Sequence, residues 1–205
     1  MIPAGSVQLE ASLRQPKHGV LRGAAVLCHP HPLHGGTMDN RVVYRAGEAA
    51  MTAGFAALRF NFRGVGASTG FFEEGIGESE DVSSVITWLE NKFPDLPLAL
   101  IGYSFGAWVG LQVGCLDPRI KAMTGIGIPL DSYDFDFLYA NRKPALLIVG
   151  SQDQFCSQGS YSALAHRLPE TSQVYTINGA DHFFSDDVDE VQHLIADFFS
   201  DLELK

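Results

Sequence analysis

A serine between two glycines is the clearest candidate for a catalytic nucleophile in this chain. Ser104 follows the apolar run 98–101 and precedes small and apolar residues that favour a helix. A sharp strand-to-helix turn at Ser104 lifts its hydroxyl clear of a sheet and places it at the positive end of the next helix. Gly102 and Gly106 have no Cβ, so they allow the neighbouring elements to approach closely. The pattern predicts a serine that attacks carbonyl groups, and the alternative is a glycine-rich turn with an incidental serine.

Such a serine needs a base within hydrogen-bond reach and a third group that orients the base. Asp153 follows a predicted strand at 144–150, and His182 follows a predicted strand at 173–177. Because parallel strands end at the same edge of a sheet, both loops emerge beside Ser104. We therefore predict that the serine, the histidine and the aspartate meet there. The alternative for His182 is an ordinary core or surface histidine.

Other acidic residues compete with Asp153 for the orienting role. Asp181 directly precedes His182, and Asp131, Asp134 and Asp136 follow an earlier predicted strand. If the loop is extended, Asp181 points away from His182. We predict Asp153 as the acid and keep the others as alternatives.

A loop rich in histidine and proline follows the predicted strand at 20–28. Its imidazoles, His29, His31 and His34, have the chemistry to bind zinc with one open position, which is the metal-dependent alternative. However, prolines alternate with the histidines and no carboxylate stands at an obvious ligand spacing. We favour histidines that stiffen the loop through hydrogen bonds, and we predict no metal site.

No nucleotide-binding motif accompanies these residues. Gly64-Val65-Gly66 is too short for a dinucleotide fingerprint, and no G-x-G-x-x-G opens a helix. We interpret this turn as tight packing near the site, with Arg63 anchoring a carboxylate of the protein. The sequence therefore predicts no cofactor.

Strands and helices alternate along the chain, which predicts an α/β fold with a mostly parallel sheet covered on both faces. Strands are expected at 7–14, 20–28, 55–62, 98–103, 122–128, 144–150 and 173–177. Helices are expected from Asp39 or Asn40 to about residue 52, and at 78–93, 104–115, 157–168 and 188–202. Segment 129–143 is too short for a helical lid, so we expect an open, shallow site.

Composition limits the partners. The 205 residues suit one domain, and the net charge of -10 argues against nucleic acid and anionic membranes as partners. Cys28 and Cys115 lie in apolar runs, and Cys156 follows a loop where we expect partial exposure. An odd number of cysteines at scattered positions favours a reducing cytoplasm. We find no signal peptide and no transmembrane run.

Over nearly its whole length the chain resembles an α/β-hydrolase, most closely the small, lid-less bacterial members related to dienelactone-hydrolase-like proteins. The resemblance is carried by the order Ser104, Asp153, His182 and by four stretches, 28–40, 62–68, 150–153 and 179–183. It implies one α/β-hydrolase domain over residues 1–205 with no cap domain. True dienelactone hydrolases use a cysteine nucleophile, where this chain has a serine.

The resemblance also implies where an oxyanion would bind. One donor is the backbone N–H of Phe105, directly after the nucleophile. The second is the backbone of His31, two residues beyond His29, with Leu33 as the alternative. The intervening prolines have no N–H to donate.

The expected activity is that of a serine hydrolase cleaving small carboxylic esters, or thioesters, through an acyl-enzyme. Lactones and small amides stay open as substrates. Tyr103, Phe155 and Phe183 are the expected substrate-binding residues. Further aromatic candidates for the acyl pocket are Phe71, Phe72, Tyr133, Phe135 and Phe184. A non-catalytic binding protein of the same fold is the main alternative, and a homodimer through a sheet edge or the terminal helix stays open.

Overall fold

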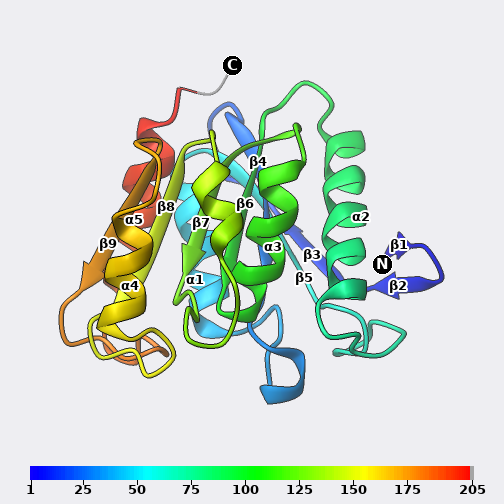
Figure 1. The fold of residues 1–205 in the computed structure, drawn as a ribbon. Helices are drawn as coiled ribbons and strands as arrows, with labels where there is room; N and C mark the ends of the chain where they lie inside the picture. The colour runs from blue at the N-terminus through cyan, green and yellow to red at the C-terminus, as the bar shows by residue number, and fades with distance from the viewer. Residues whose placement is uncertain (204–205) are drawn as a thin grey trace.

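A sheet of seven strands forms the centre of the structure, a computed structural model that describes residues 1–203 (Figure 1). The strand order is β3-β5-β4-β6-β7-β8-β9, and all neighbours pair in parallel except β3 and β5, which are antiparallel. The strands are β3 (Ala11–Arg14), β4 (Gly23–Cys28), β5 (Phe55–Phe60), β6 (Leu98–Tyr103), β7 (Ile120–Ile126), β8 (Ala145–Gly150) and β9 (Ser172–Ile177). This arrangement confirms the predicted α/β architecture.

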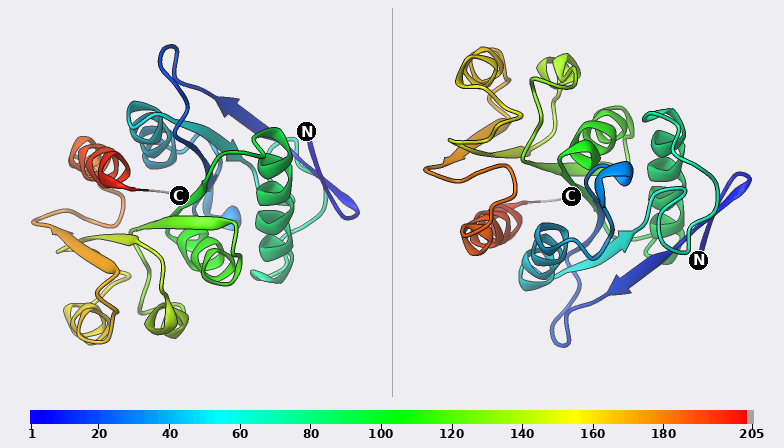
Figure 2. Two further views of the ribbon diagram at one scale, coloured as in Figure 1. Left: turned by 90° about the horizontal axis from the view of Figure 1, so that it is seen from above. Right: turned by 90° about the horizontal axis from the view of Figure 1, so that it is seen from below.

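Helices cover both faces of the sheet (Figure 2). The apolar faces of α1 (Arg41–Thr52) and α5 (Val188–Asp201) share one core cluster with the sheet. The opposite cluster contains residues of α2 (Ile76–Lys92), α3 (Phe105–Leu116) and α4 (Gln158–Ala165). Because both faces are covered, β4, β5, β6 and β8 are buried along their whole length and consist almost entirely of apolar residues.

The predicted first strand at 7–14 is in fact two strands. The hairpin of β1 (Ile2–Ala4) and β2 (Val7–Leu9) is separate, and β3 joins the main sheet. Glu10 lies at the break, where its carboxylate accepts hydrogen bonds from Asn61 Nδ2 at 2.7 Å and Ala67 N at 2.9 Å. Its contacts with the β5 end and the following turn prevent one continuous strand.

Two short segments complete the edge at which the parallel strands end. The turn η1 (Pro32–His34) follows β4, and η2 (Asp136–Ala140) is the only helical turn in segment 129–143. Asn40 caps α1 by accepting a hydrogen bond from Val42 N at 2.9 Å. As predicted, segment 129–143 forms no helical lid, so this edge is left open.

Within residues 1–203, no helix has both the length and the apolar character required to span a membrane.

Candidate active site

The chain turns sharply at Ser104, between β6 and α3. Ser104 has φ 55° and ψ −121°, a backbone conformation that L-residues rarely adopt. Such strain costs on the order of 1–3 kcal/mol and persists only where the surrounding structure enforces it. Here Ser104 N donates to Ile126 O at 2.9 Å, while Ser104 O accepts from Ala107 N and Trp108 N. The serine hydroxyl is therefore presented at the N-terminus of α3.

The glycines of the turn are required by close backbone approach. A Cβ on Gly106 would lie 2.4 Å from His29 O and 2.5 Å from Cys28 O. A Cβ on Gly102 would lie 2.4 Å from the carbonyl oxygen of Gly106. The nucleophile turn and the loop after β4 are thus packed backbone to backbone.

We expect Gly106→Ala to destabilise the fold by about 1–3 kcal/mol, because one of two backbone segments must move. The matched control is Gly159→Ala in α4, where a new Cβ meets nothing within 4 Å and alanine suits the helix. Thermal unfolding of both variants measures the difference. Equal shifts in melting temperature would contradict the close approach.

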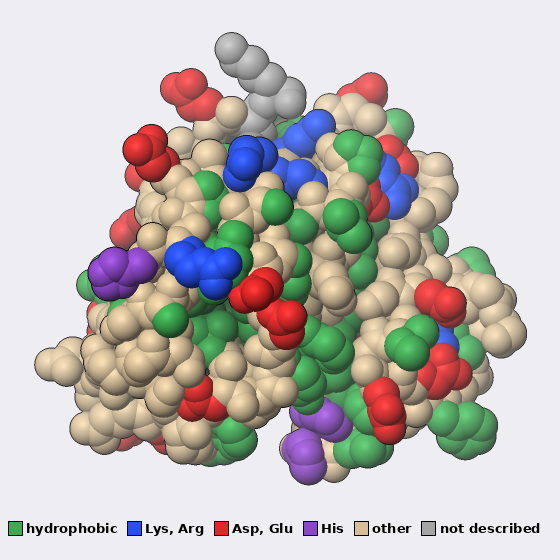
Figure 3. Space-filling model, viewed as in Figure 1, with side chains coloured by type: hydrophobic (Ala, Val, Ile, Leu, Met, Phe, Trp, Pro, Cys, Tyr) green, Lys and Arg blue, Asp and Glu red, His purple; other side chains and the backbone are tan. Residues whose placement is uncertain are grey.

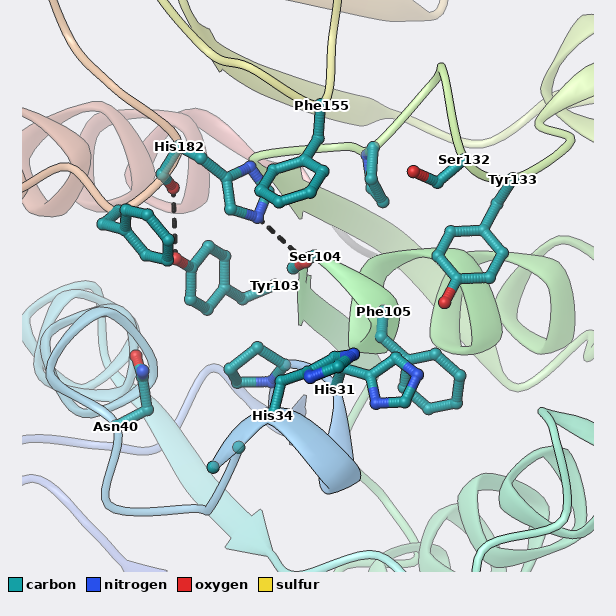
Figure 4. Close-up of a pocket in the computed structure, with 15 residues that line it drawn as sticks. His31, His34, Asn40, Tyr103, Ser104, Phe105, Ser132, Tyr133, Phe155 and His182 are labelled. Carbon is teal, nitrogen blue, oxygen red and sulfur yellow. Dashed lines mark hydrogen bonds between the residues drawn. The ribbon is translucent and has the colours of Figure 1, made fainter.

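Ser104, His182 and Asp153 form one hydrogen-bonded line, of which Figure 4 shows the bond between His182 and Ser104. His182 Nε2 lies 3.0 Å from Ser104 Oγ, and His182 Nδ1 lies 2.8 Å from Asp153 Oδ2. The three residues follow the carboxyl ends of β6, β9 and β8. The structure therefore brings together the three side chains that the sequence predicted to meet at this edge of the sheet.

The carboxylate of Asp153 is oriented by a second hydrogen bond, besides the one to His182. This carboxylate is buried, and Oδ1 accepts a hydrogen bond from Phe155 N at 2.8 Å. That bond leaves Oδ2 to face the imidazole.

Three of the four rival carboxylates are engaged elsewhere. Asp181 accepts hydrogen bonds from Ser185 N at 3.2 Å and Ser185 Oγ at 3.0 Å. Asp131 accepts from the backbone N–H and hydroxyl of Ser157 and from the hydroxyl of Ser160. Asp134 accepts from Asp136 N at 2.7 Å. Asp153 is thus the acid that the fold places against His182.

Ser104 lines a cavity of about 390 Å³. No Asp, Glu, Lys or Arg side chain is among its lining residues, which are Pro30, His31, His34, Gly35, Gly36, Asn40, Tyr103, Ser104, Phe105, Pro129, Ser132, Tyr133, Phe155, His182 and Phe183. Histidine side chains project at the corresponding edge of the molecule, below α3 and beside hydrophobic side chains (Figure 3). The cavity is therefore aromatic and free of carboxylates and permanent cations.

The expected substrate-binding residues Tyr103, Phe155 and Phe183 all line this cavity, and so does Tyr133. Ser132 and Asn40 also line it, and no sequence signal distinguished them because loop geometry alone brings them there.

Four other aromatic candidates are not among the residues that line the cavity. Phe135 and Phe184 are buried in the core, and Phe71 is exposed to solvent. Phe72 packs against the rings of His31 and Phe105, outside the cavity wall.

The histidine loop is stiffened by hydrogen bonds, as expected. His29 is fully buried; its Nε2 accepts from Phe62 N at 3.0 Å, and Nδ1 lies 2.6 Å from Pro30 O, which accepts the ring proton. Both ring nitrogens of His29 are thereby used within the protein. No group of three or more His, Cys, Asp or Glu side chains in residues 1–203 is arranged to hold a metal ion.

Burial lowers the pKa of His29 to about 4, against about 6.5 in an unfolded chain. Because the unfolded state then binds more protons between these values, stability falls as pH drops from 6.5 to 4, by about 3 kcal/mol. We expect His29→Gln to remove about this much of the pH dependence. Urea unfolding at pH 7.5, 6, 5 and 4.5 measures the slope. An unchanged slope in His29→Gln would refute the assignment.

The resemblance assigns an oxyanion hole to the backbone N–H groups of Phe105 and His31, with Leu33 as the alternative to His31. Leu33 N donates to His31 Nδ1 at 3.2 Å, so the alternative donor is already engaged. Within residues 1–203, neither Phe105 N nor His31 N donates a hydrogen bond to another atom. These two N–H groups are therefore free to bind a ligand.

The predictions for Arg63 and Cys156 have different outcomes. Arg63 anchors protein carboxylates as predicted: its guanidinium donates to buried Asp81 at 2.9 Å and to Glu80 at 3.3 Å. Cys156, expected to be partly exposed, is buried, because the loop after Asp153 folds back and Cys156 N donates to Asp153 O.

Comparison with known proteins agrees with this fold. A model of the X-Pro dipeptidyl-peptidase (S15) family matches residues 5–146. A protein of Rickettsia prowazekii (strain Madrid E), described as uncharacterized, is 37% identical over 183 residues, covering 85% of this chain and 77% of that protein. An α/β serine hydrolase homologue from Coxiella burnetii has a TM-score of 0.89 at 32% identity, covering 96% of this chain and 94% of the other. An α/β serine hydrolase without a lid from Xanthomonas campestris has a TM-score of 0.84 at 29% identity, covering 96% and 89%. By these matches the chain belongs to the S15 family, and it is an enzyme of the lid-less α/β-hydrolase type.

Proposed function

We propose that this protein is a serine esterase that cleaves small, uncharged carboxylic esters through an acyl-enzyme. The observation that carries the proposal is the hydrogen-bonded line from Asp153 through His182 to Ser104, which lines an open cavity. A serine, an imidazole and a carboxylate in this order activate a hydroxyl for acyl transfer.

In the proposed reaction, Ser104 Oγ attacks the ester carbonyl while His182 Nε2 takes the hydroxyl proton. Asp153 holds the proton on His182 Nδ1 and stabilises the imidazolium. The N–H groups of Phe105 and His31 bind the oxyanion of the tetrahedral intermediate. The alcohol leaves with the proton from His182, and a water molecule, activated by the same imidazole, releases the carboxylic acid.

The charge of the cavity supports esters over peptides with a free N-terminus as substrates. A dipeptidyl-peptidase has to hold the free ammonium group of its substrate, and a carboxylate is the group that compensates such a charge in a partly dry site. The cavity lining contains neither Asp nor Glu. The net charge of -10 also disfavours polyanionic substrates, because their approach is repelled. Neutral acyl esters, and neutral thioesters of similar size, fit best.

The test is a panel of 4-nitrophenyl esters with acyl chains from acetyl to dodecanoyl, beside matched neutral thioesters and an X-Pro 4-nitroanilide. We expect the shortest esters to be turned over fastest and the X-Pro anilide to be cleaved poorly. Faster cleavage of the anilide than of every ester would favour peptidase activity. A preference for the long chains would contradict the open, short site.

A fluorophosphonate probe separates an enzyme from a binding protein of the same fold. We expect a single adduct on Ser104, identified by mass spectrometry of the tryptic peptides. No adduct would favour a non-catalytic binding protein. Activity that a chelator abolishes, and that Ser104→Ala retains, would favour the metal-dependent alternative.

A further inference from the structure

Tyr103 ties the nucleophile strand to the loop that carries the base. It is the last residue of β6, directly before Ser104, and its side chain is buried. Its hydroxyl donates a hydrogen bond to the backbone carbonyl oxygen of His182 at 3.1 Å (Figure 4). The nucleophile and the base are therefore joined by this backbone anchor as well as by their own hydrogen bond.

The ring of Tyr103 also packs on the base. It lies nearly parallel to the imidazole of His182, with ring centroids 5.7 Å apart and an angle of 29° between the planes. Gly127, at φ +51°, leaves room for this pair: a Cβ there would lie 3.1 Å from Tyr103 Cε2 and 3.4 Å from His182 Cε1. The stacked arrangement thus depends on a glycine directly after β7.

The loop 178–187 needs such an anchor. It connects β9 to α5 and contains the non-glycine residue Phe184 at φ +50°. The side chain of His182 can be held by Ser104 and Asp153 only when its backbone already stands in the right place. Burial raises the pKa of the Tyr103 hydroxyl, so this group stays protonated and remains a donor.

We infer that Tyr103 is a positioning residue for the general base, acting through its hydrogen bond to the His182 carbonyl and its stacking on the imidazole. This inference rests on the proposed function, since it assigns His182 the role of base. Tyr103 also lines the cavity, but its hydroxyl proton is donated within the protein, to the His182 carbonyl.

The experiment compares Tyr103→Phe, which removes only the hydroxyl, with Tyr175→Phe, which removes a hydroxyl from an exposed position on β9. With a short 4-nitrophenyl ester, Tyr103→Phe should lower kcat about tenfold, the effect of one lost buried hydrogen bond. KM should stay within about twofold, and the control should match the parent protein.

A double-mutant cycle separates positioning of His182 from a general structural effect. In an Asp153→Asn background the imidazole is already misdirected, so adding Tyr103→Phe should lower kcat by less than about twofold. An equal tenfold loss in both backgrounds would overturn the inference. An unchanged kcat, or a raised KM with kcat intact, would overturn it as well.

A second readout keeps this inference distinct from the proposed function. If the parent protein hydrolyses no ester, the proposed function fails, and ¹⁵N and ¹H NMR of the His182 ring then tests the positioning role alone. We expect the Nδ1–H signal to broaden and shift upfield in Tyr103→Phe, because its bond to Asp153 is less well held. An unchanged signal would refute the role.

Discussion

Ser104→Ala will lower kcat for short esters by about 10⁵- to 10⁶-fold, the scale seen when the nucleophile of a serine hydrolase is removed. No other serine is hydrogen-bonded to His182 in residues 1–203, so no substitute nucleophile exists at the imidazole. The melting temperature should change little, because alanine requires the same strained backbone at φ 55° that serine already adopts. Hydrolysis rates and thermal unfolding of the purified variant measure both effects.

Ser132→Ala provides the matched control for this prediction. Ser132 also lines the cavity, but its hydroxyl makes no hydrogen bond to His182. Its removal should leave kcat within about twofold. Comparable losses in the two serine variants would show that the hydroxyl at 104 is not the nucleophile.

Asp153→Asn is expected to lower kcat by about 10⁴-fold at neutral pH. Phe155 N donates to one carboxylate oxygen, so the amide oxygen of asparagine will take that place and its NH₂ group will face His182. Facing a donor, Nδ1 must become an acceptor, and the ring proton moves to Nε2. The imidazole then offers Ser104 a proton instead of accepting one. Steady-state kinetics between pH 7 and 10 measures the loss.

Asp181→Asn tests whether the effect belongs to Asp153 specifically. Asp181 is adjacent to His182 in sequence, yet its carboxylate binds Ser185. We expect this variant to retain at least about half of the parent activity. A greater loss in Asp181→Asn than in Asp153→Asn would reassign the acid.

The sequence predicted those features that follow from strand ends in a parallel sheet. Ser104, Asp153 and His182 each follow the carboxyl end of a parallel strand, and parallel pairing brings such positions to one edge whatever the details of the loops. Segment length predicted the open edge, because segment 129–143 is too short to fold into more than a turn.

Features set by the loops themselves were not predictable. Phe183 and Phe184 are identical neighbours in sequence, but the positive φ of Phe184 turns its side chain into the core and leaves Phe183 beside the cavity. No periodicity governs such a segment, so inward and outward side chains cannot be told apart. The burial of Phe135 and Cys156 depends in the same way on loop backbone that propensities do not encode.

The neutral lining of the cavity has a consequence for turnover. Hydrolysis converts an uncharged ester into a carboxylate, and within a wall of aromatic rings no lysine or arginine side chain is placed to retain that anion. The protein's own negative charge repels it further into solvent. The acid formed should therefore be a weak inhibitor, and departure of the product should not limit the catalytic cycle.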